Sequence, residues 1–159
     1  MSLNFFDNFT LAQNLTLPEV QSDGSFGPPI FNRYLFTDRE ECRATIGNGE
    51  IYIVASEFNT NVIVEYRGSQ NYDMSHITSI FINDIRLDAS QTVTLRLTLA
   101  TDDLSLYQDK SINEKLSEKI TFDVYPFSGI DLTKINRISI ILIGNVPPFV
   151  VSISDITCS

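Results

Sequence analysis

Alternation of apolar and polar residues along extended segments is the feature that most constrains how this sequence can fold. The segment TVTLRLTLAT, residues 92–101, would place on one face of a strand the side chains of Val93, Leu95, Leu97 and Leu99. A period of two is typical of an antiparallel strand that turns one face to a core and the other to solvent. The same signal recurs from residue 50 onward, in residues 51–56, 61–66, 79–87, 119–125, 138–143 and 149–154.

Strand segments at this density, separated by turn-forming clusters such as Gly68 to Asp73, leave little room for helices. The sequence therefore predicts an all-β fold in which two antiparallel sheets form a sandwich, with at most one short helix. The helical candidate is residues 111–119, where Ser111 and Glu114 have the spacing of a capping box, and a long hairpin loop is the alternative. Residues 11–32 are expected to form an extended, loop-rich passage along the sandwich. A chain of 159 residues is predicted to be a single domain, residues 1–159.

A ten-residue phrase occurs twice, as DMSHITSIFI at residues 73–82 and as DLTKINRISI at residues 131–140. Each copy begins with an Asp two residues before a hydroxyl residue, an arrangement in which the carboxylate caps a tight turn. The spacing of the isoleucines then falls from three, which suits a helical turn, to two, which suits a strand. Each copy is therefore predicted to form a turn, a buried isoleucine (Ile77 or Ile135) and a strand. The two copies would mark equivalent corners of the sandwich.

The composition excludes two classes of function. The formal net charge is -9 and the pI is near 4.4, so a nucleic-acid backbone would be repelled. The longest apolar stretch, residues 138–144, is far shorter than the ~20 residues that a membrane-spanning helix needs. We therefore predict no nucleic-acid partner and no membrane span.

Cysteine content and the N-terminal residues bear on the compartment. Cys42 and Cys158 are too few to form a disulfide framework, and we interpret them as two thiols. Their pairing would require export and a short Cα separation. The opening MSLNFFDNFT has no basic region followed by an apolar one, so no signal peptide is predicted. An extracellular or cell-surface location is favoured only if a signal peptide has been removed.

Residues 119–144, KITFDVYPFSGIDLTKINRISIILIG, and residues 149–157, FVVSISDIT, resemble the last strands of galactose-binding-like jelly-roll domains. In that superfamily a strand ending in Pro-Phe and an Asp-Leu-Ser/Thr phrase precede a final strand that ends in Asp-Ile. The opening NFFDNF, residues 4–9, resembles the aromatic-Asp start of such domains, which runs beside the final strand. YDMSHITSI, residues 72–80, resembles their middle, whereas residues 11–45 have no counterpart. The resemblance implies a jelly-roll sandwich, and many members bind carbohydrate.

The resemblance also implies a structural Ca²⁺ ion where the first and last strands meet. The candidate ligands are Asp7, Asn8 and Asp155, which supply the hard oxygen donors that Ca²⁺ prefers. The alternative is that these are solvated side chains near the two ends of the chain.

A carbohydrate site needs aromatic side chains and hydrogen-bonding groups together on one face or loop rim. Tryptophan is absent, which counts against a lectin-like role. The aromatic candidates at or near predicted loops are Tyr72, Tyr107, Tyr125 and Phe149, and the polar candidates are Arg67, Asn71, Asp102 and Asp103.

Catalysis has little support in the sequence. His76 is the single histidine, so a Ser-His-Asp triad or a His-rich metal site cannot be assembled elsewhere. A carboxylate pair for glycoside hydrolysis is not singled out by any spacing among Asp38, Glu40, Glu41, Glu57, Glu65, Asp102 and Asp103. We predict a non-catalytic binding module for carbohydrate or another surface-exposed partner. The alternatives are a structural or assembly domain, such as an envelope, appendage or virion component, and a glycan-acting hydrolase. The sequence leaves the oligomeric state open.

Overall fold

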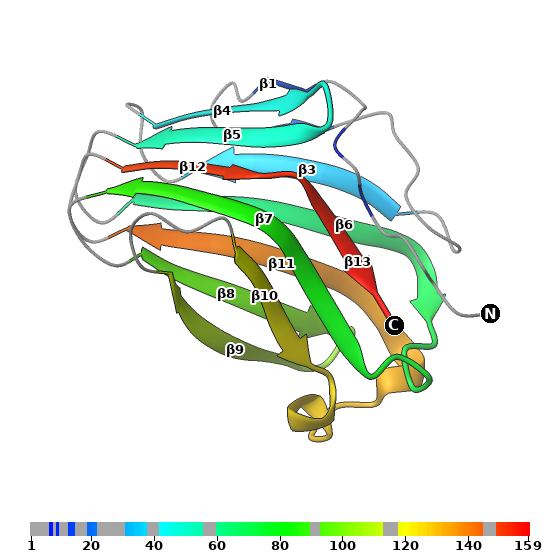
Figure 1. The fold of residues 1–159 in the computed structure, drawn as a ribbon. Coiled ribbons are helices and arrows are strands. Elements are labelled where there is room, and N and C mark those ends of the chain that lie inside the picture. The colour runs from blue at the N-terminus through cyan, green and yellow to red at the C-terminus, as the bar shows by residue number, and fades with distance from the viewer. Residues whose placement is uncertain are drawn as a thin grey trace.

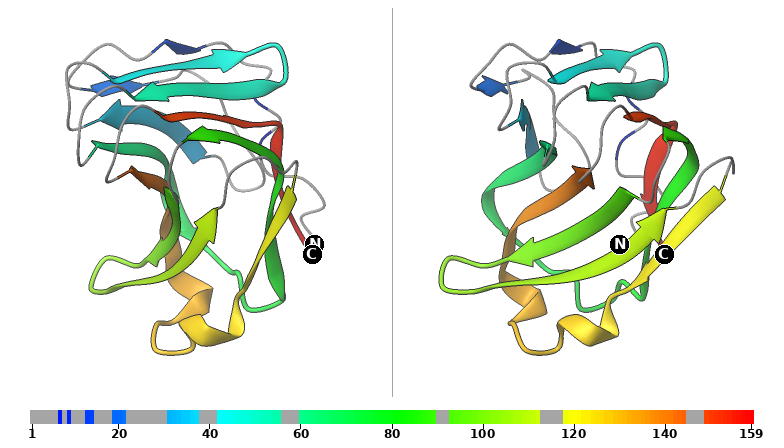
Figure 2. Two further views of the ribbon diagram at one scale, coloured as in Figure 1. Left: turned by 60° about the vertical axis from the view of Figure 1, so that its left-hand side comes forward. Right: turned by 90° about the vertical axis from the view of Figure 1, so that its left-hand side faces the viewer.

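The computed structural model describes residues 7, 9, 13–14, 19–21, 31–37, 42–55, 60–89, 93–112, 118–144 and 149–159. In these residues the chain forms two antiparallel sheets, shown in Figure 1 and from two further sides in Figure 2. The predicted all-β, two-sheet antiparallel sandwich is confirmed. The described helices are single turns, η1 (Tyr125–Phe127) and η2 (Leu132–Lys134), and no described helix is long or apolar enough to cross a membrane.

Each sheet takes strands from distant parts of the chain. One sheet runs in the order β1 (Gln13–Asn14), β4 (Cys42–Gly47), β5 (Glu50–Ala55), β12 (Phe149–Ile153), β7 (Ser79–Ala89) and β10 (Glu118–Asp123), with β13 (Asp155–Cys158) also paired to β7. We call it the seven-stranded sheet. The six-stranded sheet runs in the order β2 (Glu19–Gln21), β3 (Phe31–Thr37), β6 (Thr60–Tyr72), β11 (Ile135–Gly144), β8 (Val93–Ala100) and β9 (Ser105–Ile112).

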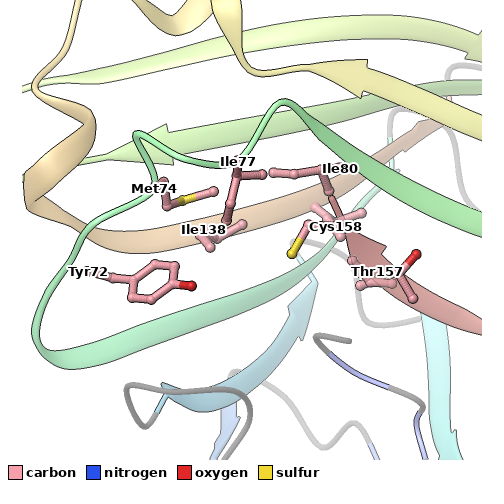
Figure 3. Close-up of a pocket in the computed structure, with 9 residues that line it drawn as sticks. Tyr72, Met74, Ile77, Ile80, Ile138, Thr157 and Cys158 are labelled. Carbon is pink, nitrogen blue, oxygen red and sulfur yellow. The ribbon is translucent and has the colours of Figure 1, made fainter. Parts of the chain in front are cut away.

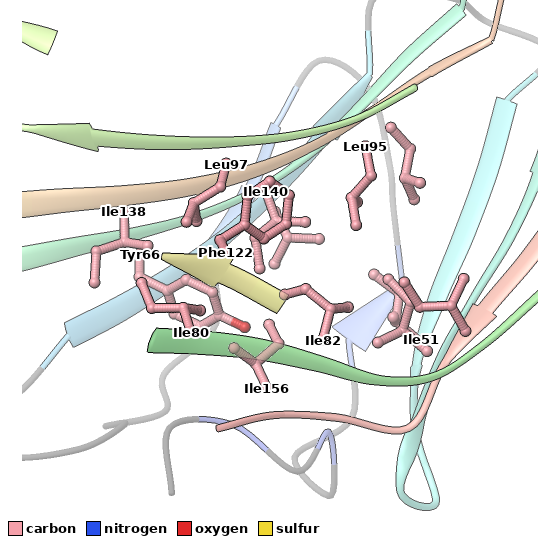
Figure 4. Packing of buried hydrophobic residues seen from close by; sticks show 14 of the residues in the cluster. Ile51, Tyr66, Ile80, Ile82, Leu95, Leu97, Phe122, Ile138, Ile140 and Ile156 are labelled. Atoms are coloured by element: carbon pink, nitrogen blue, oxygen red, sulfur yellow. The ribbon is translucent and has the colours of Figure 1, made fainter. Parts of the chain in front are cut away.

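The alternation seen in the sequence determines which side chains fill the space between the sheets. Along β8 the predicted apolar set is buried and the intervening residues are partly exposed, except Ala100. Figure 4 shows Leu95 and Leu97 of this strand packed with Ile82 of β7 and Ile140 of β11. Burying one such side chain contributes about 1.5–3 kcal/mol, so the pattern directs both sheets toward one shared core.

The two copies of the repeated phrase form matching corners, as predicted. Asp73 Oδ1 accepts hydrogen bonds from the Ser75 backbone N–H (2.9 Å) and hydroxyl (2.6 Å). Asp131 Oδ1 accepts the same pair from Thr133, at 3.1 and 2.6 Å. Ile77 and Ile135 are both buried. The first copy leads into β7 of one sheet and the second into β11 of the other.

The corners also touch each other, at the lower right of Figure 1. The Met74 backbone N–H donates to the Leu132 carbonyl at 2.7 Å. One corner therefore supports the other at the end of the sandwich where β6 gives way to β7.

A bend in the middle of β7 shapes the seven-stranded sheet. Asp84 has a φ of 50°, and the register of β7 with β10 shifts between the pairs Ile82–Ile120 and Ile85–Glu118. An extra residue in one strand is a β-bulge, which bends the strand and increases its twist. β12 and β13 follow the same bend, as the red strands of Figure 1 show.

Two sequence-based expectations need correction. Ser111 and Ile112 end β9 and Glu118 begins β10, so the candidate helix over residues 111–119 does not begin at Ser111. Residues 113–117 lie outside the described residues. The turn expected between Gly68 and Asp73 is instead an irregular part of β6, which continues to Tyr72.

Candidate functional site

The outer face of the six-stranded sheet carries a row of polar and aromatic side chains. On β3 and β6, Arg33, Leu35, Val64 and Tyr66 are fully or almost fully buried, so the alternate residues point away from the core. The strand registers align five outward residues across the sheet, in the order Tyr34, Glu65, Ser139, Thr98 and Tyr107. Because neighbouring strands lie about 4.8 Å apart, the two tyrosines stand roughly 19 Å apart along this row.

An arginine lies over the ring of each tyrosine. The Arg67 guanidinium carbon is 3.9 Å from the Tyr34 ring centroid, and its Nε donates to Glu65 Oε1 at 2.5 Å. The other oxygen of Glu65 accepts from the Ser139 hydroxyl at 3.0 Å. These contacts fix the plane of the guanidinium, because one edge is hydrogen-bonded and one face is stacked.

The second stack repeats this arrangement at the other end of the row. The Arg96 guanidinium carbon is 3.9 Å from the Tyr107 ring centroid, and Arg96 donates to both carboxylate oxygens of Asp109, at 2.7 and 2.9 Å. The hydrogen bonds lower the pKa of Asp109 and raise that of Arg96. Tyr107 nevertheless remains 60% exposed.

A polar cleft of about 250 Å³ opens beside the row. It is lined by Arg67, Gly68, Thr101, Asp102, Asn136 and Arg137. The Asn136 side-chain amide donates to Asp102 Oδ1 at 2.5 Å and so joins the start of β11 to the β8–β9 turn. The Thr101 hydroxyl accepts from the backbone N–H groups of Asp103 (3.3 Å) and Leu104 (3.2 Å), which holds that turn.

The structure brings some of the sequence-predicted ligand residues together. Arg67 and Asp102 line the cleft, and Tyr107 lies on the same sheet face. Asp103 is exposed in the adjoining turn, and Asn71 is exposed in the irregular part of β6.

The other predicted aromatic residues lie elsewhere. Tyr72 is buried and faces the core, so its ring is not available as a binding platform. Tyr125 is 85% exposed but lies at η1, on the connection between β10 and η2. Phe149 is the first residue of β12 in the seven-stranded sheet, and its side chain lies outside the described residues.

Sequence reasoning missed several residues of the site: Tyr34, Gly68, Thr101, Asn136 and Arg137. The last two are the polar positions between Ile135 and Ile138 in the repeated phrase. Their place between buried isoleucines was the available signal that they face outward. Tyr34 gave no such signal, because its segment matched nothing in the resemblance.

Tyr72 lines a small apolar cavity between the two corners, shown in Figure 3. The cavity has a volume of about 10 Å³ and a lining dominated by isoleucines, which is too small and too apolar to hold a ligand. Cys158 also lines it, and burial raises the pKa of this thiol to about 11. Cys158 is buried in β13, and the side chain of Cys42 lies outside the described residues.

The predicted calcium ligands lie in a different setting. Asp7 is fully buried and forms a backbone bridge with Ile156 of β13, so this residue lies beside the last strand as predicted. Asp7 Oδ2 accepts from Arg33 Nη1 at 2.7 Å and from the Tyr66 hydroxyl at 2.6 Å, and Oδ1 accepts from the Phe9 N–H at 2.8 Å. Burial, and then the charge of Asp7, raises the pKa of Tyr66 well above its usual value.

These described donors do not fit a Ca²⁺ ion. Ca²⁺ takes six to eight oxygens, but a guanidinium already holds the Asp7 carboxylate. The Asp155 carboxylate accepts a hydrogen bond from the Asn83 side chain, and Asn8 lies outside the described residues. In the described part of the chain, no three His, Cys, Asp or Glu residues are grouped to hold a metal. The calcium site stays a prediction.

The arrangement of the sheets matches solved carbohydrate-active proteins. An exo-β-agarase and another agarase each cover 100% of this chain with a TM-score of 0.58, at 12% and 15% identity. A family 61 carbohydrate-binding module, solved with β-1,4-galactotriose, covers 86% of the chain with a TM-score of 0.49 at 10% identity. The chain therefore shares the two-sheet antiparallel sandwich fold of these agarase domains. At these identities the likeness shows the fold alone.

This chain spans 25% of the length of each of those agarases and 90% of the carbohydrate-binding module. No protein-family model matches the chain, and no curated protein sequence matches it significantly.

Proposed function

We propose that this chain is a non-catalytic carbohydrate-binding module that holds an oligosaccharide against the outer face of the six-stranded sheet. The observation that carries the proposal is the polar cleft beside the row that ends in Tyr34 and Tyr107. A sugar ring presents C–H groups on its faces and hydroxyls at its edge. Aromatic surface and fixed hydrogen-bonding groups on one face complement both parts.

The groups in the cleft serve both hydrogen-bonding roles of a sugar hydroxyl. Arg67, Arg137 and the Asn136 amide carry N–H donors, whereas the Asp102 carboxylate is an acceptor. Arg67 and Asp102 are each oriented by a neighbouring side chain, which lowers the entropy that a ligand must overcome. The row is roughly 19 Å long, estimated from the strand spacing, and suits a chain of several sugars rather than a single one.

One of these contacts argues against an acid role for Asp109 in hydrolysis. A glycosidase needs a carboxyl group whose pKa is raised so that it can act as the acid. Arg96 lowers the pKa of Asp109, so this carboxyl does not meet that requirement. Two of the proteins that share the fold are agarases, and this chain matches only a quarter of each, which is compatible with a binding role beside a separate catalytic part.

Calorimetric titration with neutral galactan oligosaccharides of increasing length tests the proposal. We expect the affinity to rise with length and Tyr107→Ala to weaken binding by about tenfold, which corresponds to the ~1.4 kcal/mol of one aromatic contact. Tyr125→Ala is the matched control, because it removes an exposed tyrosine from a different part of the surface. If a broad glycan panel, neutral and charged, gives no binding, the proposal fails and an assembly role takes its place.

A further inference from the structure

Two arginines stand directly opposite each other beside the cleft. Arg137 of β11 is the register partner of Arg67 of β6, and both point away from the core because Tyr66 and Ile138 beside them are buried. Guanidinium groups keep their charge at any relevant pH. Like charges placed opposite each other across two strands are destabilising, so this pair carries a local cost.

The two members of the pair differ in how their charge is balanced. Arg67 is paired with Glu65 and stacked on Tyr34. Arg137 is exposed and forms no ion pair with any residue in the described ranges. Asp102 lines the same cleft, but its Oδ1 accepts a hydrogen bond from the Asn136 amide.

The rest of the molecule makes this charge pattern unusual. The chain has 20 acidic and 11 basic residues, yet the cleft is lined by two arginines and one aspartate. In a chain so rich in carboxylates, an acidic residue beside Arg137 would be expected, yet Arg137 forms no ion pair within the described residues. Unfavourable local arrangements such as two facing arginines are found mainly at functional sites. There a ligand of opposite charge can balance the arginine.

Resting on the proposed function, we propose that the cleft selects an acidic sugar and that Arg137 binds its anionic group, either a uronic-acid carboxylate or a sulfate ester. The planar guanidinium fork matches the oxygens of both groups and can bind them through two parallel hydrogen bonds. Arg67, held in place by Glu65 and Tyr34, adds a second positive charge. Asp102 faces the same cleft and accepts from a hydroxyl of the sugar.

Paired oligosaccharides that differ only in charge test this inference. The first pair is tetragalacturonate and its fully methyl-esterified form, and the second is a sulfated galactan tetrasaccharide and its desulfated form. We expect at least one charged member to bind about tenfold more tightly than its neutral counterpart, the gain of one charge-assisted bidentate contact. The pair that shows the gain distinguishes carboxylate from sulfate.

Variants on the sheet surface assign the effect to Arg137. Arg137→Gln should bring the affinities for the charged and neutral members together, because the loss falls mainly on the charged one, whereas Arg137→Lys should keep part of the preference. Asp102→Asn retains an acceptor for Asn136 and should strengthen binding of the charged member. Arg86→Gln removes an exposed arginine of β7 in the other sheet and should change nothing.

Each result has a defined reading. Equal affinity for charged and neutral members, or an equal loss of both in Arg137→Gln, overturns the acidic-sugar inference and leaves the proposed function standing. Failure of all four oligosaccharides overturns the acidic-sugar inference, and failure of the whole glycan panel overturns the proposed function as well.

Discussion

Arg33 is the largest of the fully buried side chains, and its guanidinium reaches Asp7 in the space between the sheets. A buried ion pair gives little net stability over an apolar pair of similar size, but removing one partner leaves an uncompensated charge in the interior. Tyr66 and the Phe9 N–H complete the hydrogen bonding of the carboxylate. This cluster joins β3 and β6 of one sheet to the segment that lies beside β13 of the other.

We expect Arg33→Met to lower the free energy of unfolding by about 3–5 kcal/mol, because Asp7 would stay buried without its cation. Urea denaturation followed by tyrosine fluorescence would measure the loss. The double variant Asp7→Asn/Arg33→Met should regain part of it, since no uncompensated charge remains. A double variant less stable than Arg33→Met would contradict this account of the cluster.

Asp73 and Asp131 make stability depend on pH at the two corners. Hydrogen bonds from Ser75 and Thr133 lower the pKa of these carboxyls below the value of about 3.9 expected in the unfolded chain. A carboxyl with a lowered folded pKa contributes stability that is present above the unfolded pKa and is lost as the pH falls through the folded pKa. The corners should therefore weaken on acidification below about pH 4.

The double variant Asp73→Asn/Asp131→Asn tests this dependence. It should lose less stability than the parent between neutral pH and about pH 3, because asparagine does not titrate. Urea melts at both pH values measure the difference, and the comparison cancels the contribution of the other carboxyls. Identical pH profiles for the two proteins would show that the corners do not act through these carboxylates.

At the scale of elements, the strands that follow the two corners pack against each other across the core. Ile80 of β7 and Ile138 of β11 occupy equivalent positions in the repeated phrase and line the same small cavity (Figure 3). The correspondence seen in the sequence therefore brings equivalent residues of the two sheets to one cavity.

We expect Ile138→Ala to destabilise the protein by about 3 kcal/mol, and Ile80→Ala by a similar amount. The double variant should cost less than the sum, because substitutions coupled through a shared cavity are not additive and each single change already loosens the packing around it. Ile143→Ala, on the partly exposed outer face of β11, is the control and should cost under about 1 kcal/mol. Strict additivity in chemical denaturation would mean that the two isoleucines do not support each other.

Strands with a clear period of two were predictable, and those without it were not. β8 and β11 have unbroken apolar faces, so both were recognised. β9 was missed because its sequence, SLYQDKSI, is largely exposed and carries few branched apolar residues. As an edge strand it buries little of its surface, so its sequence shows no clear alternation of apolar and polar residues.

The candidate site was predictable only in part, for a geometric reason. Arg67, Asp102 and Tyr107 were named from the sequence because each lies near a turn signal. Their common face depends on the registers that place β3, β6, β11, β8 and β9 side by side. Tyr34 and Arg137 enter the site only through those registers, which no local pattern encodes.

At the scale of the whole molecule, the candidate binding face and the buried cluster that joins the two sheets lie in different places. The candidate carbohydrate face lies on the outside of the six-stranded sheet, whereas the Asp7 cluster lies between the sheets where the first and last segments meet. A substitution on the outer face can therefore alter binding without opening the core. This separation makes the surface variants at Tyr107 and Arg137 interpretable as binding variants.

The same arrangement leads to an expectation about metal. At the junction of the first and last strands, the positive charge that faces Asp7 comes from the side chain of Arg33 and not from a bound metal ion. A ligand that binds only the folded state raises the melting temperature, and its removal lowers it. Because the described donors are already engaged, we expect neither millimolar Ca²⁺ nor excess EDTA to change the melting temperature of the parent protein. Thermal melts in both conditions, with Asp7→Asn/Arg33→Met as a comparison, measure this. A rise in melting temperature with Ca²⁺ that EDTA reverses would mean that the protein has a metal site. The Arg33 charge beside Asp7 would then not take the place of a metal ion.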